Sequence, residues 1–472
     1  MTASAIAGSS RPFESSWRGL ADSAATRPAS KPQWLGDLRS HALERVGVLK
    51  LPSTRDEDWR FTDVSTLAKH PYQPVQVPTT LKAEEIAQFH LEEATTRLVF
   101  VDGKHAPHLS STAAAEGERR GGQAAVGTLS SAIAAHGASI QAHLGRHAGF
   151  QDKLFVALNT AFLQDAAVVV AARNAQVTGP VHLLFISTQS DVVSHPRILV
   201  LAEPGSSVTL VEDHVTLHQG PCFNNPVAEI VLGASARVEH VRVQRDSAEA
   251  LHVGHCAVML GHASHYHSVS IALGARISRL GIDVVHGAEG AFCALDGLAL
   301  LSARQLADTH SCIDHAKPHG TSRQLHKTIV DSGAHAVFNG KVRVAPGAQQ
   351  TDSAQSSRNL LLSTRAQVNT LPQLEILADD VKCTHGATVG QLDSEQIFYL
   401  RSRGIAEAAA RKLLTYAFGA EVIDRISLPS LRRQLELAVL DRTAVAPAGR
   451  EAAASLRAER KPTRPDATGG LA

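Results

Sequence analysis

The sequence is poor in aromatic residues and in cysteine. Aromatic residues make up 4% of the 472 residues, whereas a surface that stacks sugars or single-stranded nucleic acid depends on them. The five cysteines are odd in number, dispersed along the chain and without a CxxC pair. This usage is typical of a reducing compartment, and it argues against a preassembled four-cysteine metal site.

Net charge and long apolar runs are lacking as well. The 46 Lys and Arg residues nearly cancel the 45 Asp and Glu residues, so we expect neither nucleic acid nor a membrane surface as a partner. The first residues show no basic and apolar regions of a signal peptide, and no apolar run approaches the ~18 residues that a spanning helix needs. We therefore expect a cytoplasmic protein.

Sequence motifs of several enzyme classes are absent too. The chain has no Walker A glycine loop, no nucleophile elbow and no HExxH motif. ATP hydrolysis, acyl transfer and zinc proteolysis by this chain are therefore poorly supported.

Short apolar runs separated by small or polar turns fill residues 166–390, most clearly from Asp331 onward. Strand-length runs of this kind are typical of β structure. Each run is too short to form a core alone, so we expect stacked coils that bury their apolar edges against one another. Glycines such as Gly205 and Gly274 stand at the turns, where a residue that tolerates positive φ is useful. Their spacing is irregular, which predicts a β solenoid with uneven coils.

Four segments flank the predicted solenoid. Residues 1–30 are rich in Ser, Ala and Gly and are expected to be mobile. Residues 31–165 show mixed helical patterns and a hairpin signal at 98–107. Helical spacing returns in residues 391–442, where we expect a small helical domain. Residues 443–472 are rich in Ala, Pro and Arg, which predicts a disordered tail.

One charged segment of the N-terminal region, residues 51–67, alternates charges with aromatic and apolar residues. Its aromatic residues are Trp59 and Phe61. We expect a capped surface helix or turn that docks through these rings.

The 25 histidines are the most unusual feature of the composition, and two groups stand close in sequence. Residues two apart on a strand share a face, so His265 with His267, and His310 with Cys312 and Asp314, could converge. Imidazole and thiolate suit borderline metals. The plainer interpretation is that these side chains occupy polar faces of the solenoid and form hydrogen bonds between coils. The two groups are His262, His265 and His267, and His310, Cys312, Asp314, His315 and His319.

Cys383 and His385, in the segment DDVKCTHGATVG, form a sharper candidate. They share one face of a strand or turn, they follow two carboxylates and they precede a glycine. A thiolate and an imidazole that close could bind iron or accept sulfur, so both residues are tentative metal ligands.

Two stretches of the chain carry distinctive motifs. They are residues 356–405, which begin SSRNLLLSTRAQVN and contain KCTHGATVG, and residues 308–344, which begin DTHSCIDHAKPHG. Both resemble the SufD branch of the SufB/SufD family, which belongs to the SUF system of iron–sulfur cluster assembly. The resemblance extends over about residues 30–440. It implies a right-handed parallel β-helix between an N-terminal helical region and a C-terminal helical domain.

The resemblance also implies partners. Family members pair with the paralogue SufB through the β-helix, and each binds a SufC ATPase subunit through its C-terminal helices. Sulfur comes indirectly from a cysteine desulfurase system. The implied cargo is a nascent iron–sulfur cluster, and reduced flavin is associated with the complex, whereas no cofactor is expected to be firmly bound by this chain. Homodimerisation in isolation is left open.

Residue roles follow from the matching motifs. His385 matches the histidine implicated at the SufB–SufD interface, and Cys383 matches its neighbouring cysteine. The segment RNLLLSTRAQVNTLPQLEI contains no cysteine where SufB-type chains carry one, which favours SufD over SufB. The expected SufC-docking residues are Phe398, Tyr399, Leu400, Arg403, Leu413, Leu414 and Tyr416.

We therefore predict a non-catalytic scaffold subunit of a SufB–SufC–SufD complex. A SufB-type paralogue is the alternative within the family. A β-helix enzyme acting on polysaccharide would need converging carboxylates and aromatic platforms, which the scarcity of aromatic residues disfavours. A free-standing histidine-rich metal-binding protein is a third interpretation, and metal analysis of the isolated chain would separate it.

Overall fold

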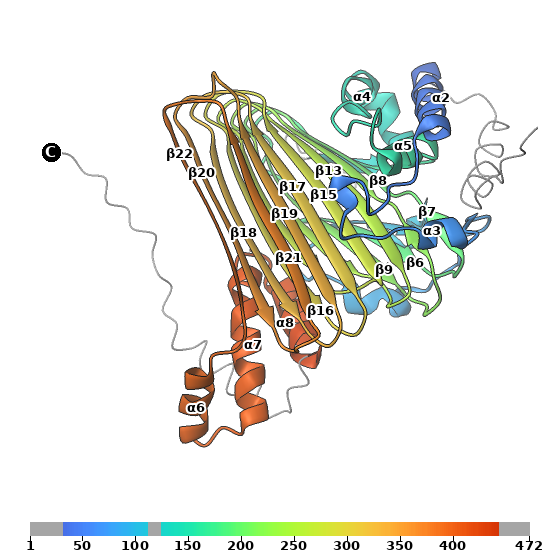
Figure 1. The fold of residues 1–472 in the computed structure, drawn as a ribbon. Helices are drawn as coiled ribbons and strands as arrows, with labels where there is room; N and C mark the ends of the chain where they lie inside the picture. Colours follow the sequence, from blue (N-terminus) through green and yellow to red (C-terminus); the bar gives the residue numbers. More distant parts are fainter. Residues whose placement is uncertain (1–31, 112–123, 443–472) are drawn as a thin grey trace, which may run out of the picture. The chain divides into compact units, whose positions relative to one another are not determined.

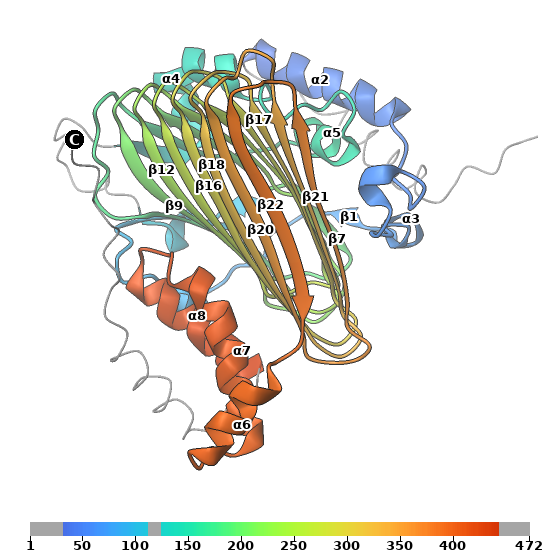
Figure 2. The ribbon, with the colours of Figure 1, turned by 60° about the vertical axis from the view of Figure 1, so that its left-hand side comes forward.

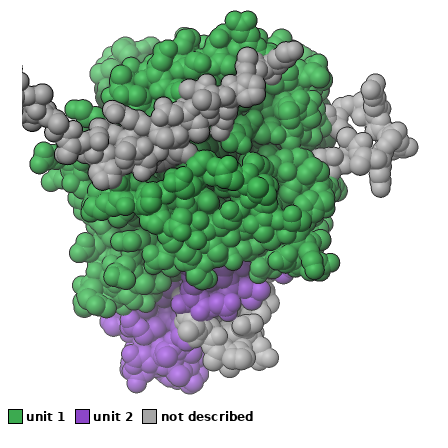
Figure 3. Space-filling model, turned by 90° about the vertical axis from the view of Figure 1, so that its right-hand side faces the viewer, with its two compact units in different colours: residues 1–390 green, residues 391–472 purple. Residues whose placement is uncertain are grey.

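The structure is a computed structural model that describes residues 32–111 and 124–442. The chain divides into two compact units, residues 1–390 and residues 391–472, which Figure 3 colours separately. The predictions of a mobile N-terminus and a disordered tail concern residues outside the described ranges.

Two sheets of mainly parallel strands run through the first unit, and successive strands alternate between them (Figure 1). This alternation stacks the chain as coils and confirms the predicted β solenoid, which begins at Ala167 and ends at Gly390. The first sheet contains β5 (Ala167–Ala171), β8 (Arg197–Ala202), β11 (Val227–Leu232), β13 (Leu251–Leu260), β15 (Ile277–His286), β17 (Leu306–His315), β19 (His335–Val344) and β21 (Gln367–Ile376). The second contains β6 (Val181–Ser187), β9 (Ser207–Thr216), β12 (Arg237–Arg245), β14 (His265–Ala272), β16 (Phe292–Leu301), β18 (Thr321–Val330), β20 (Thr351–Leu361) and β22 (Val381–Gly390).

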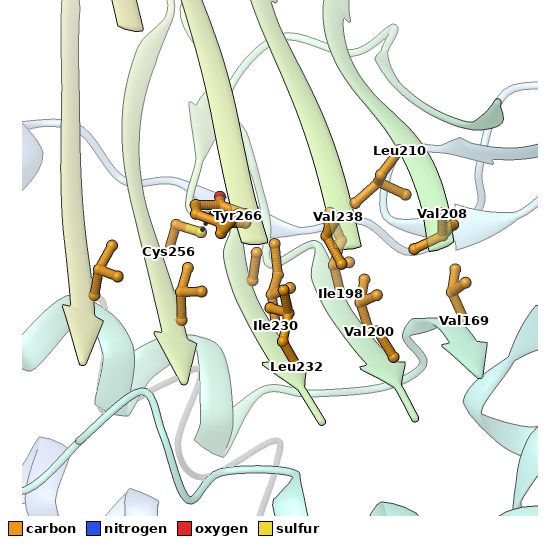
Figure 4. Packing of buried hydrophobic residues seen from close by; sticks show 14 of the residues in the cluster. Val169, Ile198, Val200, Val208, Leu210, Ile230, Leu232, Val238, Cys256 and Tyr266 are labelled. Atoms are coloured by element: carbon orange, nitrogen blue, oxygen red, sulfur yellow. Dashed lines mark hydrogen bonds between the residues drawn. The ribbon is translucent and has the colours of Figure 1, made fainter. Parts of the chain in front are cut away.

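The inside of the first coils is an apolar core. Alternate residues of each strand point inward, because side chains in a strand alternate between its two faces. Figure 4 shows Ile198, Ile230 and Cys256 of the first sheet close to Val238 and Tyr266 of the second. Burial of each such side chain stabilises the folded chain by roughly 1.5–3 kcal/mol. Each coil thus buries its apolar edge against its neighbours, as the short runs of the sequence predict.

One corner of the solenoid repeats a left-handed residue in successive coils. The backbone N–H of each such residue donates to a carbonyl of the next coil, as from Ser235 to His262 and from Ala263 to Glu289. The series is Asn174, Gly205, Ser235, Ala263, Gly290, His319 and Gln350, all with φ between 49° and 72°. The expectation that glycine supplies positive φ at the turns therefore holds for Gly205 but is wrong for Gly274, whose φ is not positive. The hydrogen bond to the next coil offsets the cost of positive φ at the non-glycine positions.

The N-terminal region begins and covers the solenoid. Strand β2 (Thr96–Val101) pairs in parallel with β6, and the predicted hairpin is confirmed by its antiparallel pairing with β3 (Lys104–His105). Strand β4 (Ala124–Thr128) pairs antiparallel with β5. The remaining elements of this region are α2 (Gln33–Val48), η1 (Glu57–Trp59), α3 (Thr66–Lys69), β1 (Gln73–Pro74), η2 (Ala83–Phe89), η3 (Pro107–Leu109), α4 (Leu129–His143) and α5 (Leu154–Ala161), and the short strands β7 (Val192–Ser194) and β10 (Phe223–Asn224) join the edge of the first sheet.

Helices α2, α4 and α5 lie against the outer face of the first sheet. Leu35 of α2 and Ile140 of α4 share an apolar cluster with Leu199 of β8. The charged segment extends this cover, because the Trp59 ring lies 3.9 Å from the guanidinium carbon of Arg279 on β15. Its predicted docking through aromatic rings is thereby confirmed, and the outer face of the first sheet is closed to other ligands at these coils.

The second unit is helical. It comprises α6 (Ser394–Ser402), α7 (Glu407–Ile423) and α8 (Pro429–Arg442). The carboxylate of Asp393 caps α6 by accepting from the N–H of Glu395. Gly404 follows α6 at φ +86°, which ends the helix. None of the helices in the described ranges is long and apolar enough to cross a bilayer.

Candidate functional site

The last coil of the solenoid leaves two strands with a free edge. Strand β21 pairs only with β19 and strand β22 only with β20, so each is the outermost strand of its sheet within the described residues. Figure 2 shows both strands at the same end of the stack. A row of unpaired backbone groups is a template for another strand. The free end of the solenoid is therefore the first candidate for a binding surface.

Proline interrupts the free edge of β21. The N–H groups of Gln367 and Leu377 donate to carbonyls on the β19 side. Backbone groups of a strand alternate between its two sides, so Pro372, five residues from each, turns its nitrogen toward the free edge. Proline has no N–H to donate, which blocks continuous strand addition along β21.

Strand β22 has an uninterrupted edge. Asp352 of β20 donates its N–H to Gly320 on the β18 side, and Lys382 is the register partner of Asp352. Register partners turn their backbone groups in the same direction, so the backbone N–H and C=O of Lys382 face β20. The backbone groups of Cys383, His385 and Ala387 therefore face the free edge. The strand contains no proline and is exposed over most of its length. Strand β22 is thus the edge that can accept a partner strand.

The side chain of Cys383 points into the last coil and is half-buried. It packs against the apolar cluster that contains Val342 and Val344 of β19. Burial raises the pKa of this thiol, and a hydrogen bond from the backbone of Ser353 opposes the rise only in part. The free chain therefore holds Cys383 as a protonated thiol at neutral pH, which is the less nucleophilic form.

The ring of His385 stands on the same side of β22, two residues further along. It is exposed, in contrast to its register partner Gln355 of β20, which is buried. The structure thus brings Cys383 and His385 together on one face of one strand, as the sequence predicts. Whether either residue binds a metal remains a prediction.

The side chains of the two histidine groups form separate ion pairs and ring contacts. His267 pairs with the carboxylate of Asp296 (3.0 Å), and His265 stacks on Phe292 with ring centroids 5.2 Å apart. His310 pairs with Asp308 (3.0 Å) on the outer face of the first sheet. Cys312 faces outward beside it, and burial raises the pKa of its thiol to about 11.

His315 points the other way, into the solenoid. Its ring lies 4.1 Å from that of His286, and Nε2 is 2.9 Å from the hydroxyl of Ser322. His310, Cys312 and Asp314 therefore share the outer face of β17, as predicted, whereas His315 lies on the opposite face. In the described ranges, no three residues of the types His, Cys, Asp and Glu are placed to hold a metal ion. Cys383 and His385 alone supply at most part of a coordination sphere.

The second unit contains a groove of about 620 Å³ between α6 and α7. It contains four of the predicted docking residues, namely Tyr399, Leu400, Leu413 and Leu414. Arg403 lies over the ring of Tyr399 at 5.3 Å, and Phe398 is 71% exposed. Tyr416, in contrast, is buried. The role of the groove residues in docking remains a prediction.

Two residues of the free end were missed by the sequence analysis. Neither Pro372 nor Gln355 is singled out by the sequence patterns above. A signal for Gln355 does exist, because it lies 30 residues before its register partner His385 and 31 residues after its register partner Gln324. That spacing is the length of one coil, so it is visible in the sequence once the coils are aligned.

Comparisons with known proteins cover nearly the whole chain. Residues 185–418 match the family model "SUF system FeS cluster assembly, SufBD core domain", and residues 21–183 match the model "SufBD protein N-terminal region". An iron–sulfur cluster assembly SufBD family protein of Synechocystis is 39% identical over 86% of this chain and 90% of its own length. The iron–sulfur cluster assembly protein SufD of Escherichia coli is 31% identical over 82% of this chain and 88% of its own. The chloroplastic protein ABCI7 of Arabidopsis thaliana is 32% identical over 88% of this chain and 87% of its own. The chain belongs to the SufB/SufD family of iron–sulfur cluster assembly proteins.

Proposed function

We propose that this chain is the SufD-type scaffold subunit of a SufB–SufC–SufD complex. Membership of the SufB/SufD family supports a role in iron–sulfur cluster assembly, and relatives named SufD match over most of their length. The absence of cysteine from residues 358–376 favours SufD over the SufB alternative. The observation that carries the proposal is the open, proline-free edge of β22 beside Cys383 and His385.

The partner at this edge is a SufB-type paralogue. A second solenoid of the same family ends in a sheet of the same spacing, so its last strand can continue the sheet by backbone hydrogen bonds. The exposed apolar side chains of Ile376, Leu377 and Val389 lie at the ends of the two outer strands. Contact with a partner would remove this apolar surface from water, which favours association.

The second partner is a SufC-type ATPase, held by the groove between α6 and α7. Tyr399 is 57% exposed at this groove and supplies a large apolar surface with a polar tip. The chain itself carries none of the glycine-loop sequence that ATP binding needs, so the energy source lies in the partner.

The subunit acts as a scaffold and not as a catalyst. The nascent iron–sulfur cluster is cargo at the junction with the SufB-type chain, where His385 offers an imidazole nitrogen suited to iron. Sulfur reaches this junction from a cysteine desulfurase system. The flavin that the resemblance implies belongs to the assembled complex and is not assigned to residues of this chain.

Co-purification with the SufB-type and SufC-type chains of the same source tests the proposal. We expect a stable three-component complex under reducing conditions, and failure to associate would reject the scaffold role. The variant His385→Ala should keep the complex assembled but lower its iron and sulfide content. His262→Ala, a change at another exposed histidine, serves as the matched control. Loss of folding in His385→Ala would make His385 a structural residue.

A further inference from the structure

A hydrogen-bonded series of polar side chains, Ser311, Gln324 and Gln355, crosses the inside of the last coils and ends beside His385. Nε2 of Gln324 donates to the hydroxyl of Ser311 at 2.6 Å. Nε2 of Gln355 donates in turn to Oε1 of Gln324, also at 2.6 Å. All three side chains are at least 95% buried, with exposures of 4% each. The two hydrogen bonds fix which end of each amide faces which neighbour.

The amide oxygen at the end of this series has no hydrogen-bond partner within the described residues. Oε1 of Gln355 is buried, and no hydrogen-bond donor reaches it within the described residues. A buried unpaired acceptor costs about 1–3 kcal/mol, so it marks a place where a donor is missing. Gly340 makes room for the amide, because a Cβ atom at that position would lie 2.1 Å from Nε2 of Gln355.

The residue of the next coil that is in register with Gln355 and can supply a side-chain donor is His385. Gln355 and His385 are register partners of adjacent parallel strands, so their side chains leave the sheet on the same side, one coil apart. The neighbouring inward positions of β22 are Cys383 and Ala387. Cys383 is the other ionisable group on that face, and its thiol is occupied by the backbone of Ser353.

We propose that Gln355 is a positioning residue that accepts a hydrogen bond from the ring of His385 and thereby selects its tautomer. One ring nitrogen then carries the proton and faces the inside of the coil. The other nitrogen keeps its lone pair and is directed to the open end. A metal-binding histidine commonly donates its second ring N–H in this way, which orients the ring and raises its basicity.

This inference deepens the proposed function, on which its biological meaning rests. The series from Ser311 through Gln324 to Gln355 would orient the His385 ring at the junction. In this orientation the ring could bind iron or accept a hydrogen bond from a donor of the SufB-type partner. The hydrogen bond itself belongs to this chain alone. It can therefore be tested without the partner.

The test is the tautomer of His385, measured by two-bond ¹H–¹⁵N correlation spectra of the full chain with ¹⁵N-labelled histidine. His385→Gln assigns the signals. We expect one dominant tautomer in the parent chain and in Gln355→Glu, which keeps an acceptor at this place. In Gln355→Met, which has a similar shape without an acceptor, the tautomer ratio should fall about fivefold, the bias that one net hydrogen bond provides.

Ser353→Ala is the control, because Ser353 is the register partner of Cys383 and not of His385. It should leave the tautomer unchanged, and circular dichroism should show every variant folded. The inference is overturned if Gln355→Met keeps the parent ratio, or if Gln355→Glu reverses it, since reversal would make Gln355 a donor. Failure of the complex to assemble would reject the proposed function and leave this result standing.

Discussion

Arg197 and Glu229 form an ion pair that is wholly buried between the N-terminal helices and the first sheet, with Nη2 and Oε2 2.5 Å apart. The carboxylate of Glu229 also accepts backbone N–H groups from Gly145, His147 and Ala148. Arg197 donates its other amino group to Asn159 and Thr160. One pair therefore ties the loop after α4 and the end of α5 to strands β8 and β11.

Removal of this carboxylate should strongly destabilise the chain. In Glu229→Gln, the guanidinium of Arg197 stays buried without a counter-charge, which typically costs about 3–5 kcal/mol. Urea unfolding followed by circular dichroism measures the change in the free energy of unfolding. Lys341→Ala is the control, since it removes an exposed pair with Glu375 whose attraction is screened by water, so the loss of stability should be much smaller. Equal losses in the two variants would contradict the assigned role of the buried pair.

A glycine pair tests how closely the coils approach. A Cβ atom at Gly274 would lie 2.0 Å from the carbonyl oxygen of Asp246, whereas Gly347 has nothing within 4 Å. We expect Gly274→Ala to destabilise the chain by about 2–4 kcal/mol or to prevent folding, because the backbone of the neighbouring coil must shift.

Gly347→Ala is expected to change the stability by less than about 1 kcal/mol, and a small gain would fit the lower entropy of the unfolded chain. Thermal unfolding of the two variants measures the difference. Similar melting temperatures for both would show that the stack is looser than the structure indicates.

Buried neutral histidines should make the protein sensitive to mild acid. Burial lowers the pKa of His252 and of His326 to about 4, whereas an unfolded imidazole titrates near pH 6.5. The unfolded chain therefore binds more protons between these values. Stability from these groups is complete above about pH 6.5 and is lost as the pH falls toward 4, by up to about 1.4 kcal/mol per pH unit for each histidine.

Urea unfolding at a series of pH values between 7 and 5 measures this loss. In His326→Leu, the slope of stability against pH should be smaller than in the parent chain by the share of one histidine. An unchanged slope would mean that His326 takes up its proton in the folded chain too.

The groove of the second unit should hold the SufC-type ATPase. Tyr399→Asp places a charge on the groove wall and is expected to weaken ATPase binding at least tenfold, because burying an unpaired carboxylate is costly. Surface plasmon resonance with the isolated ATPase measures the affinity. Leu437→Asp alters another exposed apolar residue, on α8 and outside the groove. If both variants bind as the parent chain does, the docking surface lies elsewhere.

Much of the fold could be predicted from the sequence, because the relevant signals are local. The solenoid boundaries, the hairpin at Asp102–Gly103 and the helix cap at Asp393 follow from apolar periodicity and turn residues. The corners could not be predicted in the same way. Ala263 and His319 adopt positive φ because a carbonyl of the next coil receives their N–H, and that carbonyl is far away in sequence.

In the candidate site, too, local features could be predicted from the sequence and contacts between coils could not. Cys383 and His385 stand out because they are two residues apart in one strand, which places them on one face. The pair His310 and His315 differs by an odd number, and the structure puts these side chains on opposite faces of β17. The neighbour of His385 in the stack, Gln355, depends on the register between coils, which local patterns do not set.

The central claim is that the free edge of β22 receives a strand of the SufB-type partner. The most direct test compares the affinities of Ala387→Pro and Ala387→Ser for that partner. The backbone N–H of Ala387 faces the free edge, so proline removes a donor there and leaves the pairing with β20, whereas serine keeps the donor. The account predicts at least a tenfold loss of affinity for the folded proline variant and parent-like affinity for the serine variant. Parent-like affinity for a folded Ala387→Pro chain would contradict it.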